Sequence, residues 1–135
     1  MDAPVELLKR VPLFQGLSPQ QIEQLARSFK DRTFAAGQTV TSEGAGGVGF
    51  FVIEAGTASV TVGGDERSPL GPGDYFGELA LIDDSPRSAT IVADSDLVCW
   101  GLTSWEFKPL VETNASIAWA LLQVLAKRLR AAESR

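Results

Sequence analysis

Three residues in one short segment carry groups that could hold a phosphorylated sugar. Arg87 offers a planar fork of N–H donors that suits a phosphate, and Glu78 offers oxygens that accept hydrogen bonds from a sugar hydroxyl. Gly77 lets the backbone approach a ligand closely, and the N–H groups that follow it can face an anion. Together they predict a nucleotide site. The alternative is a surface ion pair between Glu78 and Arg87 beside an ordinary turn glycine.

The same segment resembles a known binding motif. Residues 76–90, FGELALIDDSPRSAT, are similar to the phosphate-binding cassette of cyclic nucleotide-binding domains, and residues 70–75 extend the similarity. Such domains occur in regulatory subunits of cAMP-dependent kinases, in the bacterial catabolite activator protein and in cyclic-nucleotide-gated channels. Residues 76–90 are called the cassette below. Weaker matches at residues 11–18, 38–44 and 50–60, and in the C-terminal helical stretch, carry the resemblance over nearly the whole chain.

The resemblance implies a role for each matching residue. Arg87 would pair with the exocyclic oxygens of a cyclic phosphate, and Glu78 would accept a hydrogen bond from the ribose 2′-hydroxyl. Gly77 would allow the close turn. The backbone N–H groups near Leu79 and Ala80 would meet phosphate or ribose oxygens. The expected ligand is therefore a cyclic mononucleotide.

The resemblance also bears on which base is bound. Ser88 would place a hydroxyl near the phosphate or the base, and Ala89 matches a small residue at a point where bulk would intrude on the ligand. Serine after the arginine favours cAMP, but its hydroxyl could also reach the amino group of guanine, so cGMP is the alternative. A lid over the base is expected from the C-terminal helix, with Trp119 and Leu122 as candidates. Trp119 is equally consistent with a core aromatic.

Composition limits the classes of function. A chain of 135 residues is expected to be one domain, and its net charge of −5 argues against a surface for a nucleic acid polymer. The absence of histidine removes the Ser-His-Asp arrangement and histidine-ligated metal sites, so neither an enzyme nor a metal or other cofactor is expected. No apolar run predicts a membrane span. The single cysteine, Cys99, predicts a buried thiol and a cytoplasmic protein.

The pattern of apolar residues predicts three parts within a single domain, residues 1–135. Residues 1–30 are expected to form N-terminal helices, the second of which opens with a capping box between Ser18 and Gln21. Residues 31–102 contain short alternating strands separated by glycine and proline turns, with the cassette near their end. The expected class is α+β: an antiparallel β-roll, or jelly roll with double-stranded β-helix topology, flanked by helices.

Residues 103–135 are predicted to form C-terminal helices. A capping box between Thr103 and Glu106 opens a short helix, and Asn114 is expected to cap a long one. Apolar residues of the long helix follow heptad spacing: Ala118, Leu122, Leu125, Leu129 and Ala132. This seam suits packing against the roll and a homodimer about equally.

The resulting hypothesis is a regulatory sensor domain. Ligand binding would redock the helices after Thr103 and so switch a protein partner or fused effector that the sequence does not identify. One alternative is a nucleotide-independent interaction or dimerisation module with a degenerate pocket. Another is an enzyme on a similar barrel, such as a nucleotide hydrolase, for which the sequence offers no histidine and no metal motif beyond Asp83 and Asp84.

Overall fold

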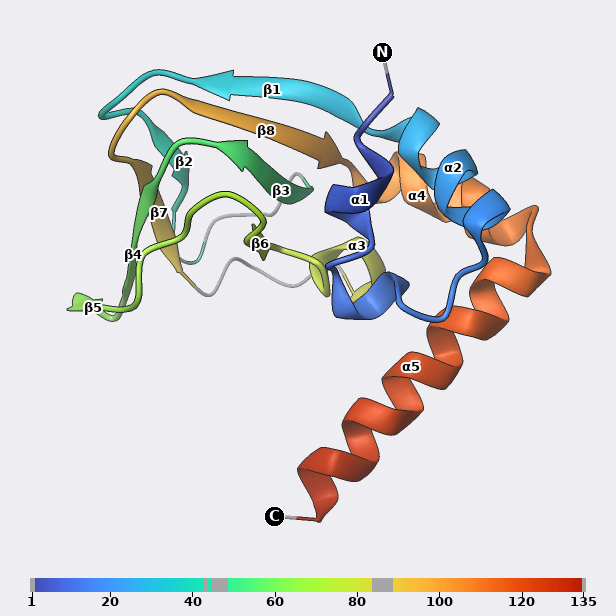
Figure 1. Ribbon diagram of the computed structural model, residues 1–135. Coiled ribbons are helices and arrows are strands. Elements are labelled where there is room, and N and C mark those ends of the chain that lie inside the picture. Colours follow the sequence, from blue (N-terminus) through green and yellow to red (C-terminus); the bar gives the residue numbers. More distant parts are fainter. Residues whose placement is uncertain (1, 43, 45–48, 84–88, 135) are drawn as a thin grey trace.

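The computed structural model describes residues 2–42, 44, 49–83 and 89–134. Helices occur at both ends of the chain, and the strands lie between them, interrupted by one short helix (Figure 1). In chain order they are α1 (Val5–Leu8), the 3-10 helix η1 (Pro12–Phe14), α2 (Pro19–Ser28), β1 (Lys30–Phe34), β2 (Thr39–Thr41), β3 (Phe50–Ala55), β4 (Ala58–Val62), β5 (Asp65–Glu66), β6 (Tyr75–Phe76), α3 (Ala80–Asp83), β7 (Thr90–Ala93), β8 (Leu97–Leu102), α4 (Ser104–Glu112) and α5 (Ala115–Glu133).

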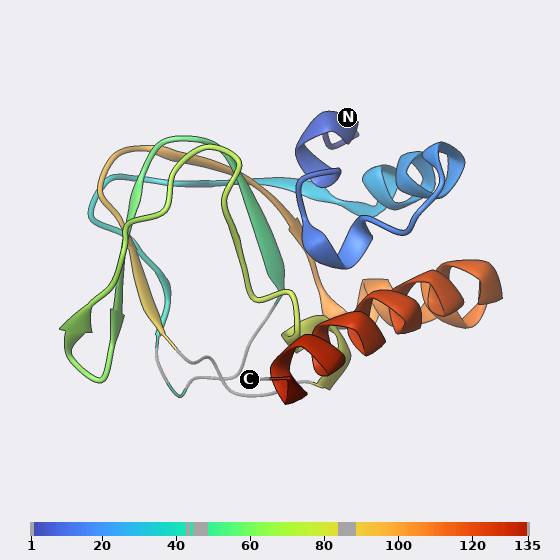
Figure 2. The same cartoon turned by 60° about the horizontal axis from the view of Figure 1, so that its bottom comes forward.

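The strands form two four-stranded antiparallel sheets. One has the order β1-β8-β3-β6 and the other β2-β7-β4-β5. Figure 2 shows the two sheets facing each other, with the helices gathered at one end. The predicted α+β fold, an antiparallel roll with flanking helices, is confirmed.

The central strand β3 separates two apolar layers. Phe50 and Val52 belong to a cluster shared with the helices, whereas Phe51 and Ile53 belong to a cluster between the two sheets. Successive side chains of a strand point to opposite faces, so a strand buried on both faces needs an unbroken apolar run. This explains why the run starting at Phe50 does not alternate with polar residues.

Aromatic rings join the N-terminal helices to the roll. The ring centroids of Phe14 and Phe50 lie 5.8 Å apart, and those of Phe29 and Phe50 lie 5.9 Å apart, both pairs edge to face. Phe14 follows α1 and Phe29 follows α2, and both are fully buried or nearly so. The helices at this end of the sheet therefore share one core with β3.

Both predicted capping boxes are present, at Ser18 with Gln21 and at Thr103 with Glu106. The second N-terminal helix ends at Ser28 rather than at about Lys30, because Lys30 already pairs with β8 as the first residue of β1. Asn114 is the N-cap residue of α5, as predicted, but its side chain makes no capping hydrogen bond. Its Nδ2 donates to the Leu110 carbonyl at 2.8 Å.

The C-terminal helix α5 begins beside the N-terminal helices and extends away from the roll (Figure 1). Its buried residues, Ile117, Ala120 and Leu121, all lie in its first two turns. Cys99 on β8 is fully buried, and burial raises the pKa of its thiol to about 12, as a core cysteine requires. Within the described ranges, none of the helices has the length and apolar content needed to cross a bilayer.

Candidate functional site

The short strand β6 fixes the start of the cassette to the core. Tyr75 and Phe76 pair with Val52 and Phe51 of β3. Their rings point to opposite layers: the Tyr75 centroid lies 6.2 Å from that of Phe50, and the Phe76 centroid lies 5.3 Å from that of Phe51. The next two residues therefore leave the sheet from a well-anchored edge.

Gly77 makes the turn that follows. Its φ of +83° lies in the left-handed region, which residues with a side chain rarely adopt. The Ala80 N–H donates to the Gly77 carbonyl at 3.2 Å and closes the turn into α3. The predicted close turn is present. In this conformation the Ala80 N–H is used within the turn, whereas it was predicted to meet a ligand oxygen.

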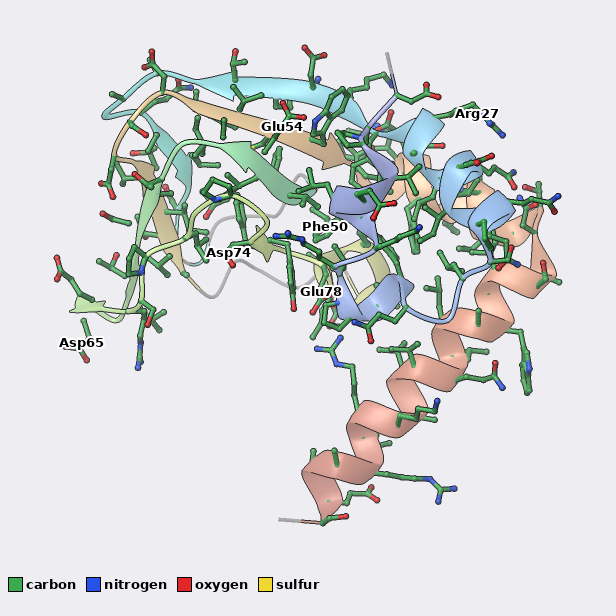
Figure 3. The ribbon with its side chains drawn as sticks, in the orientation of Figure 1. Arg27, Phe50, Glu54, Asp65, Asp74 and Glu78 are labelled. Atoms are coloured by element: carbon green, nitrogen blue, oxygen red, sulfur yellow. The ribbon has the colours of Figure 1, made fainter. Side chains whose placement is uncertain are left out.

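The turn places Glu78 in a buried position, where it is 9% exposed. Its Oε1 lies 3.2 Å from Nη2 of Arg128, which comes from the distant helix α5. Its Oε2 is buried and has no hydrogen-bond partner among the described residues. Figure 3 shows Glu78 between the roll and the long helix. A buried acceptor left unpaired costs about 1–3 kcal/mol, so this oxygen is a candidate for binding a ligand donor.

The electrostatics of Glu78 agree with a carboxylate that lacks one partner. Burial raises the pKa of Glu78, and the attraction and hydrogen bond from Arg128 oppose that rise without cancelling it. Burial and then the charge of Glu78 also raise the pKa of Tyr75, while Arg128 lowers it. Tyr75, Glu78 and Arg128 thus form one interacting group. The surface ion pair considered for Glu78 does not describe this arrangement, because the carboxylate is buried.

The far end of the cassette is also anchored. Ala89 packs against the cluster between the sheets, and its carbonyl accepts a hydrogen bond from the Thr41 hydroxyl at 3.2 Å. Thr41 is only 7% exposed. Arg87 and Ser88, predicted to contact phosphate and base, lie outside the described residues, so their roles stay predictions.

An apolar groove of about 710 Å³ lies beside the turn, between α3, α4 and α5. Leu122, one of the two predicted lid residues, lines this groove. Trp119, the other, is 63% exposed. Trp119 precedes Arg128 by nine residues, and such a spacing places two side chains on opposite faces of a helix. The structure therefore does not bring Trp119 toward Glu78. The side chain of Leu79, whose backbone N–H was predicted to meet a ligand oxygen, is 48% exposed.

The sequence analysis did not identify Arg128 as a partner of Glu78. A signal was present in the spacing of α5. Ile117, Leu121 and Val124 form one stripe at spacings of four and three, and Arg128 continues it four residues later. A charged residue at the end of a buried stripe faces the body of the protein, where it needs a counter-ion.

Comparison with known proteins places these residues in context. The family model described as "Cyclic nucleotide-binding domain" matches residues 31–114, which include the whole cassette. A cyclic nucleotide-gated potassium channel from Mesorhizobium japonicum is 37% identical over 130 residues, covering 96% of this chain and 36% of the channel. A cyclic AMP receptor protein from Thermus thermophilus is 32% identical over 131 residues, covering 93% of this chain and 61% of that protein.

A solved structure is also similar to this chain. The N-terminal domain of a transcriptional regulator from Streptomyces coelicolor A3(2) superposes with a TM-score of 0.88 at 30% identity, covering 95% of this chain and 93% of that one. The chain spans less than two thirds of the length of either curated relative above.

Proposed function

We propose a function for this chain from the premise that it belongs to the family of cyclic nucleotide-binding domains. It is a domain of the regulatory type, and we propose that its ligand is cAMP. The observation that carries the proposal is the buried Glu78 carboxylate, whose Oε2 has no hydrogen-bond partner among the described residues. A sugar hydroxyl is a neutral donor of the right chemistry for that oxygen.

The roles of the other cassette residues follow from this assignment. Arg87 would bind the cyclic phosphate, Ser88 would reach the phosphate or base, and Ala89 would leave room for the ligand. The two anchored ends of the cassette support this arrangement, because Gly77 follows a strand fixed to the core and Ala89 is held by Thr41. A binding loop with both ends anchored loses less entropy when it orders around a ligand.

The preference for cAMP over cGMP rests on two observations. Ser88 follows Arg87 in the sequence, and the Thermus thermophilus relative is named a cyclic AMP receptor protein. The hydroxyl of Ser88 is also able to accept from the guanine amino group, so cGMP is the second ligand to test. We propose no cofactor and no catalytic activity toward the nucleotide.

A calorimetric titration tests the proposal. Purified protein is titrated with cAMP, cGMP and 5′-AMP, which lacks the cyclic phosphate. We expect cAMP to bind more tightly than cGMP and 5′-AMP to bind only weakly. Recovery of intact cAMP after incubation checks that it is not hydrolysed. Equal affinities for cAMP and 5′-AMP, or no binding of either nucleotide, would contradict a cyclic-nucleotide site.

We also propose that binding acts on a protein partner or a fused effector through the C-terminal helices. The exposed leucines of α5 support a homodimer as part of this output, because Leu122 and Leu129 are 56% and 61% exposed and share the heptad seam. Sedimentation of the protein and of its Leu129→Glu variant tests the dimer. A monomer in both cases contradicts it, whereas a dimer that binds no nucleotide favours the alternative of a pure dimerisation module.

A further inference from the structure

Among the described residues, only two with a hydroxyl, amide or charged side chain are buried, and they lie at the two ends of the cassette. Glu78 is 9% exposed and Thr41 is 7% exposed. Burying a polar group costs free energy, so a fold keeps few such groups and pairs those that it keeps. The proposed ligand contact gives Glu78 a function. Thr41 lies far from the cassette in sequence, and its burial at the far end of the cassette has no function assigned so far.

The pairing of β2 with β7 changes register at Thr41. Thr39 pairs with Val92 of β7, whereas Thr41 pairs with Ile91, so two steps along β2 match one step along β7. A bulge of this kind alters the direction in which a side chain points, and bulges often occur beside functional sites. Here the Thr41 hydroxyl reaches past its register partner and donates to the Ala89 carbonyl at 3.2 Å. The irregular pairing therefore aims a buried hydroxyl at the cassette.

The hydrogen bond fixes a residue that is proposed to border the ligand. Ala89 lies directly before β7, and its side chain packs against the cluster between the sheets. Packing holds the methyl group in place, whereas a directional hydrogen bond also sets the orientation of the peptide group. A peptide group that is oriented before the ligand arrives does not have to be ordered by the ligand, and this raises the affinity.

We propose that Thr41 is a positioning residue for the nucleotide: its hydroxyl holds the Ala89 peptide group in the orientation that the bound ligand requires. The inference rests on the proposed function of the cassette. It requires no contact between Thr41 and the ligand, because Thr41 acts through Ala89. The effect on binding should therefore be that of one neutral hydrogen bond.

The first test removes the hydroxyl and keeps the shape of the side chain. Thr41→Val replaces the hydroxyl with a methyl group, and Thr39→Val, at an exposed threonine of the same strand, is the control. We expect calorimetry to show that Thr41→Val weakens cAMP binding about two- to tenfold, as for the loss of one neutral hydrogen bond. Thr39→Val should match the wild type.

A second pair of variants isolates the hydroxyl. Thr41→Ser and Thr41→Ala differ from each other by the hydroxyl alone, so their comparison remains valid even if the loss of a methyl group lowers the stability of both. Thr41→Ser should retain most of the cAMP affinity, and Thr41→Ala should lose as much as Thr41→Val. Because Thr41 lies at the end of the cassette away from Glu78, the loss should be the same for cAMP and for 2′-deoxy-cAMP.

A spectroscopic test observes the hydrogen bond itself and needs no nucleotide. Ala89 and Thr90 form the only alanine–threonine pair in the sequence. If alanine carries an NMR-active isotope at its carbonyl carbon and threonine at its amide nitrogen, a carbonyl–amide correlation spectrum contains a single signal. Thr41→Val should move the Ala89 carbonyl signal upfield, because the carbonyl loses a hydrogen-bond donor. Thr41→Ser and Thr39→Val should leave the signal near its wild-type position.

The outcomes separate this inference from the proposed function. If the wild type binds no cyclic nucleotide, the function proposed for the cassette fails, and the positioning role fails with it even where the carbonyl signal confirms the hydrogen bond. If the wild type binds cAMP, and Thr41→Val moves the carbonyl signal without changing the affinity, the hydrogen bond only supports the fold and the positioning role alone is wrong. A loss confined to cAMP, with 2′-deoxy-cAMP unaffected, also overturns that role.

Discussion

Two glutamates of this protein each meet a cation from a distant element, yet their surroundings differ. Glu106, at the start of α4, accepts from the Thr103 N–H and hydroxyl with one oxygen and from Lys30 with the other. Glu78, in the cassette turn, pairs with Arg128 through one oxygen and has a buried second oxygen without a partner among the described residues. The more buried carboxylate is the less satisfied one.

Their titration reflects this difference. Burial acts to raise the pKa of Glu106, but its hydrogen bonds with Lys30 and Thr103 outweigh burial and lower it. Burial raises the pKa of Glu78, and Arg128 offsets that rise only in part. A carboxylate that supports the fold is fully paired, whereas one held open for a ligand retains an unfavourable environment. The comparison teaches that the unpaired oxygen, rather than the ion pair, identifies the functional residue.

The largest expected effect concerns the cation predicted to share the ligand with Glu78. Arg87→Leu removes one partner of a desolvated arginine–phosphate pair, which costs about 2–5 kcal/mol. Calorimetry should show cAMP affinity falling by roughly thirty-fold to several thousand-fold. Circular dichroism should show a folded domain. Affinity close to that of the wild type would remove Arg87 from the site and leave Glu78 without its predicted counterpart.

A smaller effect is expected when Glu78 itself becomes neutral. Glu78→Gln should weaken cAMP binding about tenfold, because a hydrogen bond to a charged acceptor is worth more than one to an amide. The same change should raise the midpoint of thermal unfolding at neutral pH. Because the pKa of Glu78 is raised in the folded protein, its ionisation lowers the stability of the wild type as pH rises through the folded pKa. The stability gained by Glu78→Gln should therefore vanish at pH values below the pKa of this residue in the unfolded chain. Lower stability at neutral pH would contradict this assignment.

The smallest effect is expected at Glu106, with the opposite sign. Glu106→Gln should lower the free energy of unfolding by about 0.5–1 kcal/mol at neutral pH, as for a partly exposed ion pair. Because the pKa of Glu106 is lowered, its contribution exists above the pKa of the unfolded chain and disappears as pH falls through the folded value. Urea unfolding at several pH values measures this, with the exposed Glu23→Gln as the control. Binding of cAMP should be unchanged.

Much of the fold could be predicted from sequence because local chemistry determines it. The capping boxes at Ser18 and Thr103 are contiguous motifs, and both are present. The apolar run starting at Phe50 and the alternation before Gly63 indicated the strands β3 and β4. Helix ends were less predictable, because the pairing of Lys30 with β8 is a contact across the chain.

The candidate site was predictable only where one segment holds it. Gly77 and Glu78 were identified from the cassette motif, and the structure places them at the end of an anchored strand. Arg128 lies fifty residues further along the chain, and no local pattern links it to Glu78. Its pairing depends on the angle at which α5 leaves the body. The lid residues Trp119 and Leu122 depend on the same angle, so the sequence could not distinguish which of them faces the site.

The most direct measurement is a calorimetric cycle with cAMP and 2′-deoxy-cAMP on the wild type and Glu78→Ala. If the Glu78 carboxylate accepts the 2′-hydroxyl, the variant should lose about 10–150-fold in cAMP affinity, as for a charged hydrogen bond of about 1.5–3 kcal/mol. Its affinity for 2′-deoxy-cAMP should change far less. Equal losses for both nucleotides, in a variant that unfolds like the wild type, would contradict the claim that Glu78 binds the ribose.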